Sequence, residues 1–172
     1  MIQDIQSIPF QLFRPLHKLL YTISIVPLGN LIHMMKTYQG NYFTASIPDT
    51  WDSEFDNEAG IDVLYNENGH GEVQISSVIH DEELTPNDLM HIAEEDLHAG
   101  ATLQELDLGE FHGFWFDYAT NDDYWCEWYL CCGQLMLFAT YNCSLEDEGK
   151  EYDAIEKIIE SLLPSDNSHS GT

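Results

Sequence analysis

Residues 111–142, FHGFWFDYATNDDYWCEWYLCCGQLMLFATYN, decide the fold of this chain. They contain three apolar runs, 111–119, 124–132 and 135–142, which the polar sequences TNDD and GQ separate. Aromatic and aliphatic runs of this length, joined by short turn-forming sequences, are typical of β-strands that pair with their neighbours along the chain. The segment therefore predicts an antiparallel meander of three strands.

The last two of these runs are apolar on both faces of the strands that they predict. Successive side chains of a strand point to opposite faces, and Trp128 and Leu130 alternate here with Trp125 and Tyr129. Residues 135–138, LMLF, show the same pattern. Strands with two apolar faces lie at the centre of a sheet that is covered on both sides.

Shorter apolar segments before the meander predict further strands. Residues 42–47 predict a strand that Pro48 closes, 61–65 and 72–80 predict a hairpin, and 103–108 predict one more strand before the meander. The hairpin turn carries the sequence NENGHG, which is rich in turn-forming residues.

Two helices complete the expected elements. The first begins at Thr85, which caps it while Asp88 completes a capping box, and it ends at Gly100. The second begins at Ser144 and ends before Pro164. The apolar stripe of the first helix consists of Leu89, Ile92, Ala93 and Leu97.

The whole pattern predicts an α+β fold with a central antiparallel sheet of about six to seven strands flanked by helices, an α/β/α sandwich. We expect residues 37–163 to form this domain, 164–172 to be a disordered tail and 1–36 to be an N-terminal extension. Three interpretations of the extension stay open: a translation start assigned too early, an export signal, or an accessory helix.

Charge restricts the partners of this chain. It has five Lys and Arg residues against 31 Asp and Glu, a formal net charge of -26, and no Lys or Arg from residue 37 to residue 149. Such a surface repels phosphates and attracts basic surfaces. We therefore expect that the chain binds a basic protein and does not bind nucleic acid. The alternative is that the acidity only keeps the chain soluble. The apolar residues 19–32 are too few, and too interrupted by Pro27, to span a membrane.

The order of elements resembles the PsbP-like fold. It consists of a strand ending in Ile47-Pro48-x-x-Trp51, a hairpin, a capped helix, an antiparallel meander and a closing helix, over about residues 37–163. That fold, an α/β/α sandwich, is shared by a photosystem oxygen-evolving accessory subunit, a Ran-binding nuclear transport factor and many small bacterial proteins. The resemblance implies a non-enzymatic binding module and transfers no functional residue, since Pro48 and Trp51 are structural.

Aromatic and acidic residues around the first turn of the meander form the candidate binding site. They are Trp115, Asp122, Asp123, Trp125 and Glu127. Aromatic side chains ringed by carboxylates are what a protein that binds a basic surface presents. The alternatives are that the aromatic residues are core and that the acids are ordinary turn residues.

A second candidate site lies on the first helix. His91, Glu95 and His98 share a polar face, and the i to i+4 spacing of His91 and Glu95 could hold a divalent metal. The alternative is a solvated helix face. The sequence predicts no cofactor, because it contains neither a glycine-rich phosphate loop nor an H-E-x-x-H motif.

No catalytic residue is predicted. The chain lacks a G-x-S-x-G motif, and its four cysteines lie in apolar strands in a strongly negative surrounding, which disfavours a reactive thiolate. We therefore predict a non-enzymatic acidic protein-binding domain, an inhibitor or immunity-type protein for a basic partner, in the cytoplasm. The alternatives are a small-molecule or metal-binding module, and export if residues 1–36 act as a signal.

Overall fold

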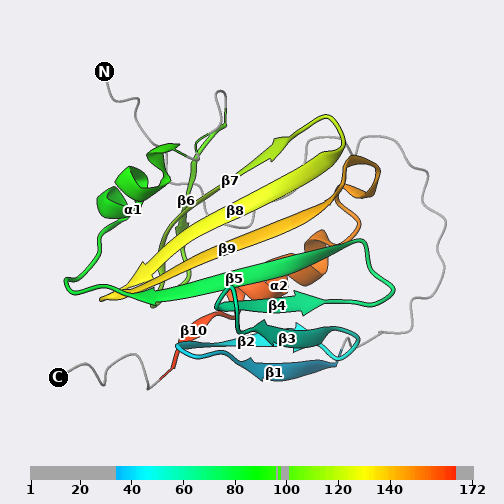
Figure 1. The fold of residues 1–172 in the computed structure, drawn as a ribbon, viewed down its shortest axis with the longest axis horizontal. Coiled ribbons are helices and arrows are strands. Elements are labelled where there is room, and N and C mark those ends of the chain that lie inside the picture. Colours follow the sequence, from blue (N-terminus) through cyan, green and yellow to red (C-terminus); the bar gives the residue numbers. More distant parts are fainter. Residues whose placement is uncertain (1–33, 96, 98–100, 166–172) are drawn as a thin grey trace, which may run out of the picture.

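The computed structural model describes residues 34–95, 97 and 101–165, and these residues form two antiparallel sheets and two α-helices (Figure 1). The large sheet has seven strands in the order β3-β4-β5-β9-β8-β7-β6, and the small sheet has the order β1-β2-β10. The strands are β1 (Met35–Gln39), β2 (Phe43–Pro48), β3 (Asp52–Asp56), β4 (Ile61–Tyr65), β5 (Gly71–Ile79), β6 (Gln104–Asp107), β7 (His112–Ala119), β8 (Asp123–Cys132), β9 (Leu135–Ser144) and β10 (Leu163–Pro164). The α-helices are α1 (Pro86–Ile92) and α2 (Tyr152–Glu160).

The predicted meander is confirmed as β7-β8-β9. Trp115 lies opposite Trp128 in the β7–β8 pair, and Tyr129 lies opposite Phe138 in the β8–β9 pair. Strand β9 also pairs along its length with β5, so that the two strands with apolar faces lie in the interior of the large sheet. The predicted α+β class, a central antiparallel sheet flanked by helices, is confirmed.

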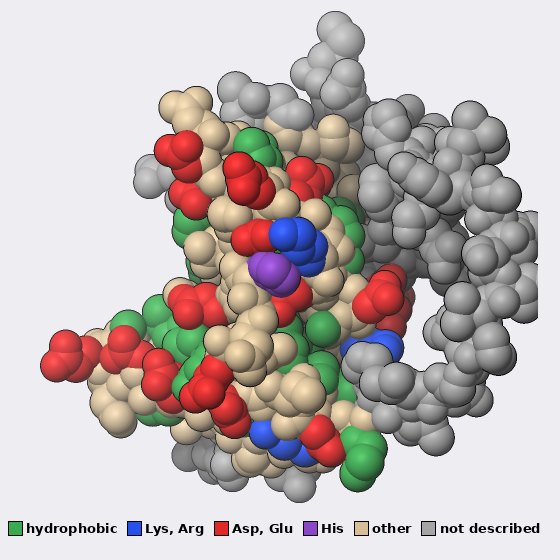
Figure 2. Space-filling model, turned by 90° about the vertical axis from the view of Figure 1, so that its right-hand side faces the viewer, with side chains coloured by type: hydrophobic (Ala, Val, Ile, Leu, Met, Phe, Trp, Pro, Cys, Tyr) green, Lys and Arg blue, Asp and Glu red, His purple; other side chains and the backbone are tan. Residues whose placement is uncertain are grey.

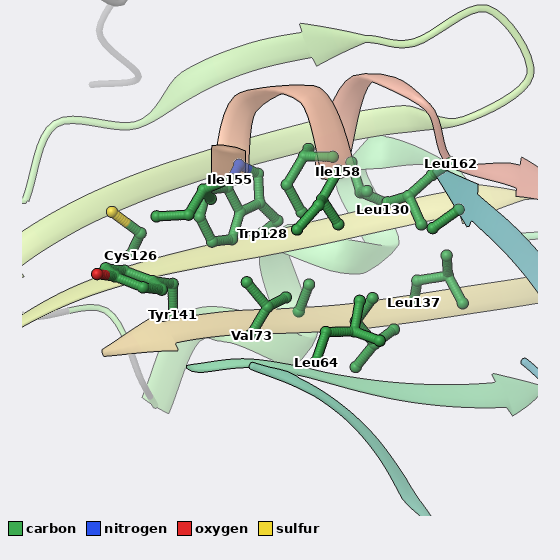
Figure 3. Packing of buried hydrophobic residues seen from close by; sticks show 14 of the residues in the cluster. Leu64, Val73, Cys126, Trp128, Leu130, Leu137, Tyr141, Ile155, Ile158 and Leu162 are labelled. Carbon is green, nitrogen blue, oxygen red and sulfur yellow. The ribbon is translucent and has the colours of Figure 1, made fainter. Parts of the chain in front are cut away.

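One face of the large sheet, which we call the core face, is covered by α2 and by the small sheet. Its side chains include Trp128, Leu130 and Leu137, which are buried with Ile155 and Ile158 of α2 (Figure 3). Burying a large apolar side chain contributes about 1.5–3 kcal/mol. The core face therefore holds the main hydrophobic core, and Figure 1 shows α2 passing behind the sheet.

The opposite face, which we call the pocket face, carries α1 at one end. Leu89 and Ala93 pack there against Phe114, Tyr129 and Met136. Thr85 and Asp88 form the predicted capping box. The main contacts of α1 are with β7 and β8, and the side chains of β4, β5 and β9 farther along this face are only partly buried.

The structure differs from the predictions at β1 and β3. β1 begins at Met35, inside the segment assigned to the extension, and pairs along its length with β2. The sequence of β3, DSEFD, shows no apolar alternation, because all five of its residues are exposed. Strand β3 owes its conformation to pairing with β4 at the edge of the sheet.

Both helices are shorter than predicted. After Ile92 the chain continues as a short 3₁₀ turn, and Leu97 is not helical; the predicted end at Gly100 lies outside the described residues. Ile92, predicted to be buried, is 42% exposed.

The second helix begins at Tyr152 and not at Ser144, because Gly149 adopts a left-handed conformation (φ 81°) that interrupts a continuous helix. Pro164, expected in a disordered tail, belongs to β10 and pairs with Phe43 of β2. Over the described residues, neither helix has the length and apolar character needed to cross a membrane.

Candidate functional site

Trp125 and Glu127, two of the predicted binding residues, lie together on the pocket face of β8. They line a pocket of about 300 Å³. Its walls come from four neighbouring strands: Ile61, Gln74, Ser76, Trp125, Glu127, Phe138 and Thr140. The register explains this grouping, because Glu127 lies opposite Thr140 of β9, and Thr140 lies opposite Gln74 of β5.

Glu127 is the polar centre of the pocket and is only 6% exposed. The hydroxyl group of Tyr118 donates a hydrogen bond to its Oε1 at 2.8 Å, and that of Tyr129 donates to Oε2 at 3.4 Å. A buried carboxylate needs such donors, because its transfer from water is otherwise costly. These bonds hold the carboxylate in a fixed orientation.

Trp125 forms the aromatic wall of the pocket and is partly exposed. Its indole ring stacks on the ring of Tyr118, with 6.4 Å between the centroids and an angle of 5° between the planes. Because Tyr118 also donates to Glu127, the three side chains form one connected unit. Chemically, this unit presents a carboxylate beside an aromatic face.

Trp115 does not belong to this site. It lies on the core face, 6% exposed, and stacks on Trp128 with 6.3 Å between the ring centroids. Trp115 and Trp125 therefore contribute to opposite faces of the sheet.

Asp122 and Asp123 lie at the exposed turn between β7 and β8, beside the pocket and not in it. The carbonyl of Asp122 accepts a hydrogen bond from the backbone of Leu145 at 2.8 Å, and Thr120 closes the turn by hydrogen bonds with Asp123. Asp123 also lines a shallow polar depression of about 450 Å³ with His70 and other residues. The turn therefore extends the negative surface next to the pocket.

A group of charged side chains stabilises the same end of the molecule. Asp147 contacts Lys150, lies 3.2 Å from Nδ1 of His70, and accepts a hydrogen bond from Ser144 at 2.8 Å. The hydrogen bonds from Lys150 and Ser144 lower the pKa of Asp147 to about 2. Figure 2 shows this end of the molecule, where carboxylates spread over the surface around adjoining basic and histidine side chains.

A second buried carboxylate, which sequence reasoning missed, lies on the core face. Asp62 of β4 is 2% exposed and accepts a hydrogen bond from the hydroxyl of Tyr38 in β1 at 2.5 Å. Within the described structure its Oδ2 atom has no hydrogen-bond partner. Burial raises the pKa of Asp62, against the opposing effect of the Tyr38 hydrogen bond. This contact joins the small sheet to the large one.

The predicted metal ligands are only partly covered by the structure. His91 is exposed on α1. His98 and the side chain of Glu95 lie outside the described residues. Over the described part of the chain, no three or more His, Cys, Asp or Glu side chains are grouped so that they could hold a metal ion.

The four cysteines are free thiols, and three of them are buried. Burial raises the pKa of Cys126 to about 12, and it also raises the pKa of Cys131, Cys132 and Cys143. These thiols are therefore protonated at neutral pH, which is unfavourable for a nucleophile.

Sequence reasoning missed the neighbours that make Trp125 and Glu127 into a pocket. Tyr118 and Tyr129 orient the carboxylate, and Phe138 and Thr140 come from the adjacent strand. The available signal was the alternation within 135–142, which places Phe138 and Thr140 on one face. The register that sets them beside Glu127 comes only from the structure.

No protein-family model matches this chain. No curated protein matches its sequence.

Solved structures are similar to it in fold. A protein from Bacteroides thetaiotaomicron matches with a TM-score of 0.53 and 16% identity, over 74% of this chain and 49% of that one. This chain therefore spans about half the length of the Bacteroides protein. LpqN, described as involved in cell envelope biogenesis of Mycobacterium tuberculosis, matches with a TM-score of 0.53 and 14% identity, over 77% of this chain and 91% of that one.

Cyanobacterial PsbP from Synechocystis is also among the matching structures, with a TM-score of 0.39 and 10% identity, over 80% of this chain and 96% of that one. At such identities the similarity concerns the fold, which this chain shares with the Bacteroides protein and LpqN.

Proposed function

We propose that this protein is a non-enzymatic binding domain that holds a basic protein through the pocket face of its large sheet, as an inhibitor or immunity-type protein does. The observation that carries the proposal is Glu127, a nearly buried carboxylate in the wall of a pocket beside the partly exposed Trp125. A carboxylate and an aromatic ring are complementary to a cationic side chain.

The charge of the surrounding strands supports this proposal. Every strand of the large sheet lies between residues 37 and 149, a stretch without Lys or Arg. Lys36 lies 3.8 Å from Asp52 at the sheet edge, and Lys150 contacts Asp147 at the end of the molecule. A surface of one sign steers an oppositely charged partner and excludes nucleic acid.

The rigidity of the site also supports binding. Trp125 is stacked on Tyr118, and Tyr118 is hydrogen-bonded to Glu127. Side chains that are already held in place lose little conformational entropy when a partner binds. Aromatic residues in such positions are common interface hot spots.

The test is an affinity experiment with the tagged full-length protein in lysate of its own host. Bound proteins are eluted with a salt gradient, because salt screens nonspecific attraction between exposed charges. The retained protein is identified by mass spectrometry, purified and titrated by calorimetry. We expect a basic protein whose Kd rises at least about 30-fold with Trp125→Ala or Glu127→Gln, as for an interface hot spot.

Glu160→Gln is the matched control. Glu160 is exposed at the end of α2, which covers the core face, and its replacement removes the same charge. This variant should bind as the unchanged protein does. If all three variants bind alike, or if every protein elutes together at low salt, the acidity serves solubility and the proposed function is wrong.

A further inference from the structure

The pocket on β4, β5, β8 and β9 combines one carboxylate, one indole and several small polar groups. We infer that it binds a single guanidinium group, which an arginine side chain of the basic partner supplies. This inference rests on the proposed function and adds the chemical identity of the group that is recognised. Three features of the pocket support it: the orientation of the carboxylate, the size of the pocket and the distribution of hydrogen-bond acceptors.

Two tyrosine hydroxyl groups orient the carboxylate of Glu127. Tyr118 and Tyr129 donate to its two oxygens at 2.8 Å and 3.4 Å, and both donors are neutral. A carboxylate oxygen accepts more than one hydrogen bond. Glu127 can therefore keep both tyrosine bonds while it accepts a bidentate pair of N–H groups from a guanidinium.

The size of the pocket limits its occupant. Its volume of about 300 Å³ lies at the lower end of the range of about 300–1,000 Å³ for sites that enclose a drug-sized ligand. The pocket opens on a sheet face, and four adjacent strands form its walls. It therefore accommodates the end of one side chain that projects from a partner surface.

The walls favour guanidinium over ammonium. Guanidinium is planar and weakly hydrated, stacks on aromatic rings and has five N–H donors, whereas ammonium is a compact, strongly hydrated charge. Trp125 and Phe138 supply aromatic faces, and Ser76 and Thr140 supply hydroxyl acceptors. Gln74 donates its amide nitrogen to Glu72, which leaves its amide oxygen as a further acceptor. These acceptors suit a flat group with several donors.

The test uses the full-length protein, labelled with ¹⁵N and titrated with N-acetyl-arginine methylamide in nuclear magnetic resonance experiments at constant ionic strength. We expect saturable shifts of the Trp125 indole N–H and of the amides of Phe138 and Thr140. The lysine counterpart should bind about two- to tenfold more weakly, the factor for loss of one hydrogen bond, because ammonium cannot form the bidentate pair with Glu127. Glu127→Gln should weaken arginine binding at least about tenfold, because a hydrogen bond to a charged group is lost.

Two further variants keep the result interpretable. Trp125→Leu changes a partly exposed residue and tests the stacking contact if Glu127→Gln does not fold. It should weaken binding of the arginine derivative by about two- to fivefold. The affinity is measured from the amide shifts of Phe138 and Thr140. Glu160→Gln controls for the loss of one negative charge and should leave both titrations unchanged.

The outcomes separate this inference from the proposed function. Two results would overturn the guanidinium assignment. One is equal affinity for the arginine and lysine derivatives, and the other is shifts that spread over the whole acidic surface and are unchanged in Glu127→Gln. Neither result bears on whether partner binding depends on Trp125. The opposite result is also possible: the protein binds the arginine derivative selectively, but Glu127→Gln retains the basic partner as well as the unchanged protein does. The guanidinium site would then stand, and the proposed function would be wrong.

Discussion

Asp62 and Glu127 are the two charged residues that the described structure buries, and they lie on opposite faces of one sheet. Asp62 lies on the core face beneath the small sheet, where its contact is Tyr38 of β1. Glu127 lies on the pocket face and borders a cavity that reaches solvent. The comparison teaches that a buried carboxylate has two settings here: Asp62 joins two layers of the fold, and Glu127 is held by two tyrosine hydroxyls at the border of a pocket.

The same contrast exists between two tryptophans of β8. Trp128 on the core face is 1% exposed and packs with Ile155 and Ile158 (Figure 3). Trp125 on the pocket face is partly exposed. They come from one strand and differ only in the face to which they point. Substitutions that are identical in chemistry can therefore measure the difference between the faces.

The largest effect is expected from replacing these tryptophans by alanine. Trp128→Ala should lower the free energy of unfolding by about 3–5 kcal/mol, because it leaves a cavity in the core. Trp125→Ala should lower it by only about 1 kcal/mol. Urea denaturation followed by far-ultraviolet circular dichroism measures both. Equal losses would mean that the pocket face is packed as tightly as the core face, and the comparison would fail.

An intermediate effect is expected from removing one tyrosine hydroxyl on each face. Tyr38→Phe should lower the free energy of unfolding at pH 7 by about 1–3 kcal/mol, because Asp62 is then buried without its donor. Tyr118→Phe should cost less, since Glu127 keeps the hydrogen bond from Tyr129. The same denaturation experiment compares the two variants.

The loss for Tyr38→Phe should depend on pH in a defined direction. The pKa of Asp62 is raised in the folded protein, so its contribution to stability is greatest below the unfolded value of about 3.9. The contribution then declines as the pH rises through the folded value, because burial disfavours the ionised form. The loss should be smaller at pH 3 than at pH 7. The hydrogen bond from Tyr38 lowers the pKa of Asp62 and so favours its ionised form. A loss that is the same at both values would contradict this preference.

The smallest effect is expected at the end of the molecule, where neither face is involved. The pKa of Asp147 is lowered to about 2 by hydrogen bonds from Lys150 and Ser144. A lowered carboxyl pKa adds stability above the unfolded value of about 3.9, and this stability is lost as the pH falls toward 2. Asp147→Asn should therefore have a slightly lower urea midpoint than the unchanged protein at pH 6, and the same midpoint near pH 2. If the urea midpoints of the two proteins still differ at pH 2, the effect of the substitution comes from packing and not from the charge.

The sequence predicted the central strands well because β8 and β9 are apolar on both faces, a pattern that only the interior of a covered sheet explains. It could not predict β3, because an exposed edge strand carries no apolar alternation. At the site, sequence reasoning found Trp125 and Glu127 but grouped them with Trp115. Which residues face each other depends on the register across the turn, and a shift of one residue exchanges the faces.

The pairing of β5 with β9 has a consequence for how the chain reaches its fold. Helix α1 and strands β6, β7 and β8 all lie between these partners in the sequence. Such non-local pairing slows folding. During synthesis the edge of β5 that pairs with β9 has no partner strand until β9 has been made. Unpaired strand edges promote aggregation. The stretch without Lys or Arg covers all of these strands. Nascent chains therefore carry charge of one sign and repel one another during this interval.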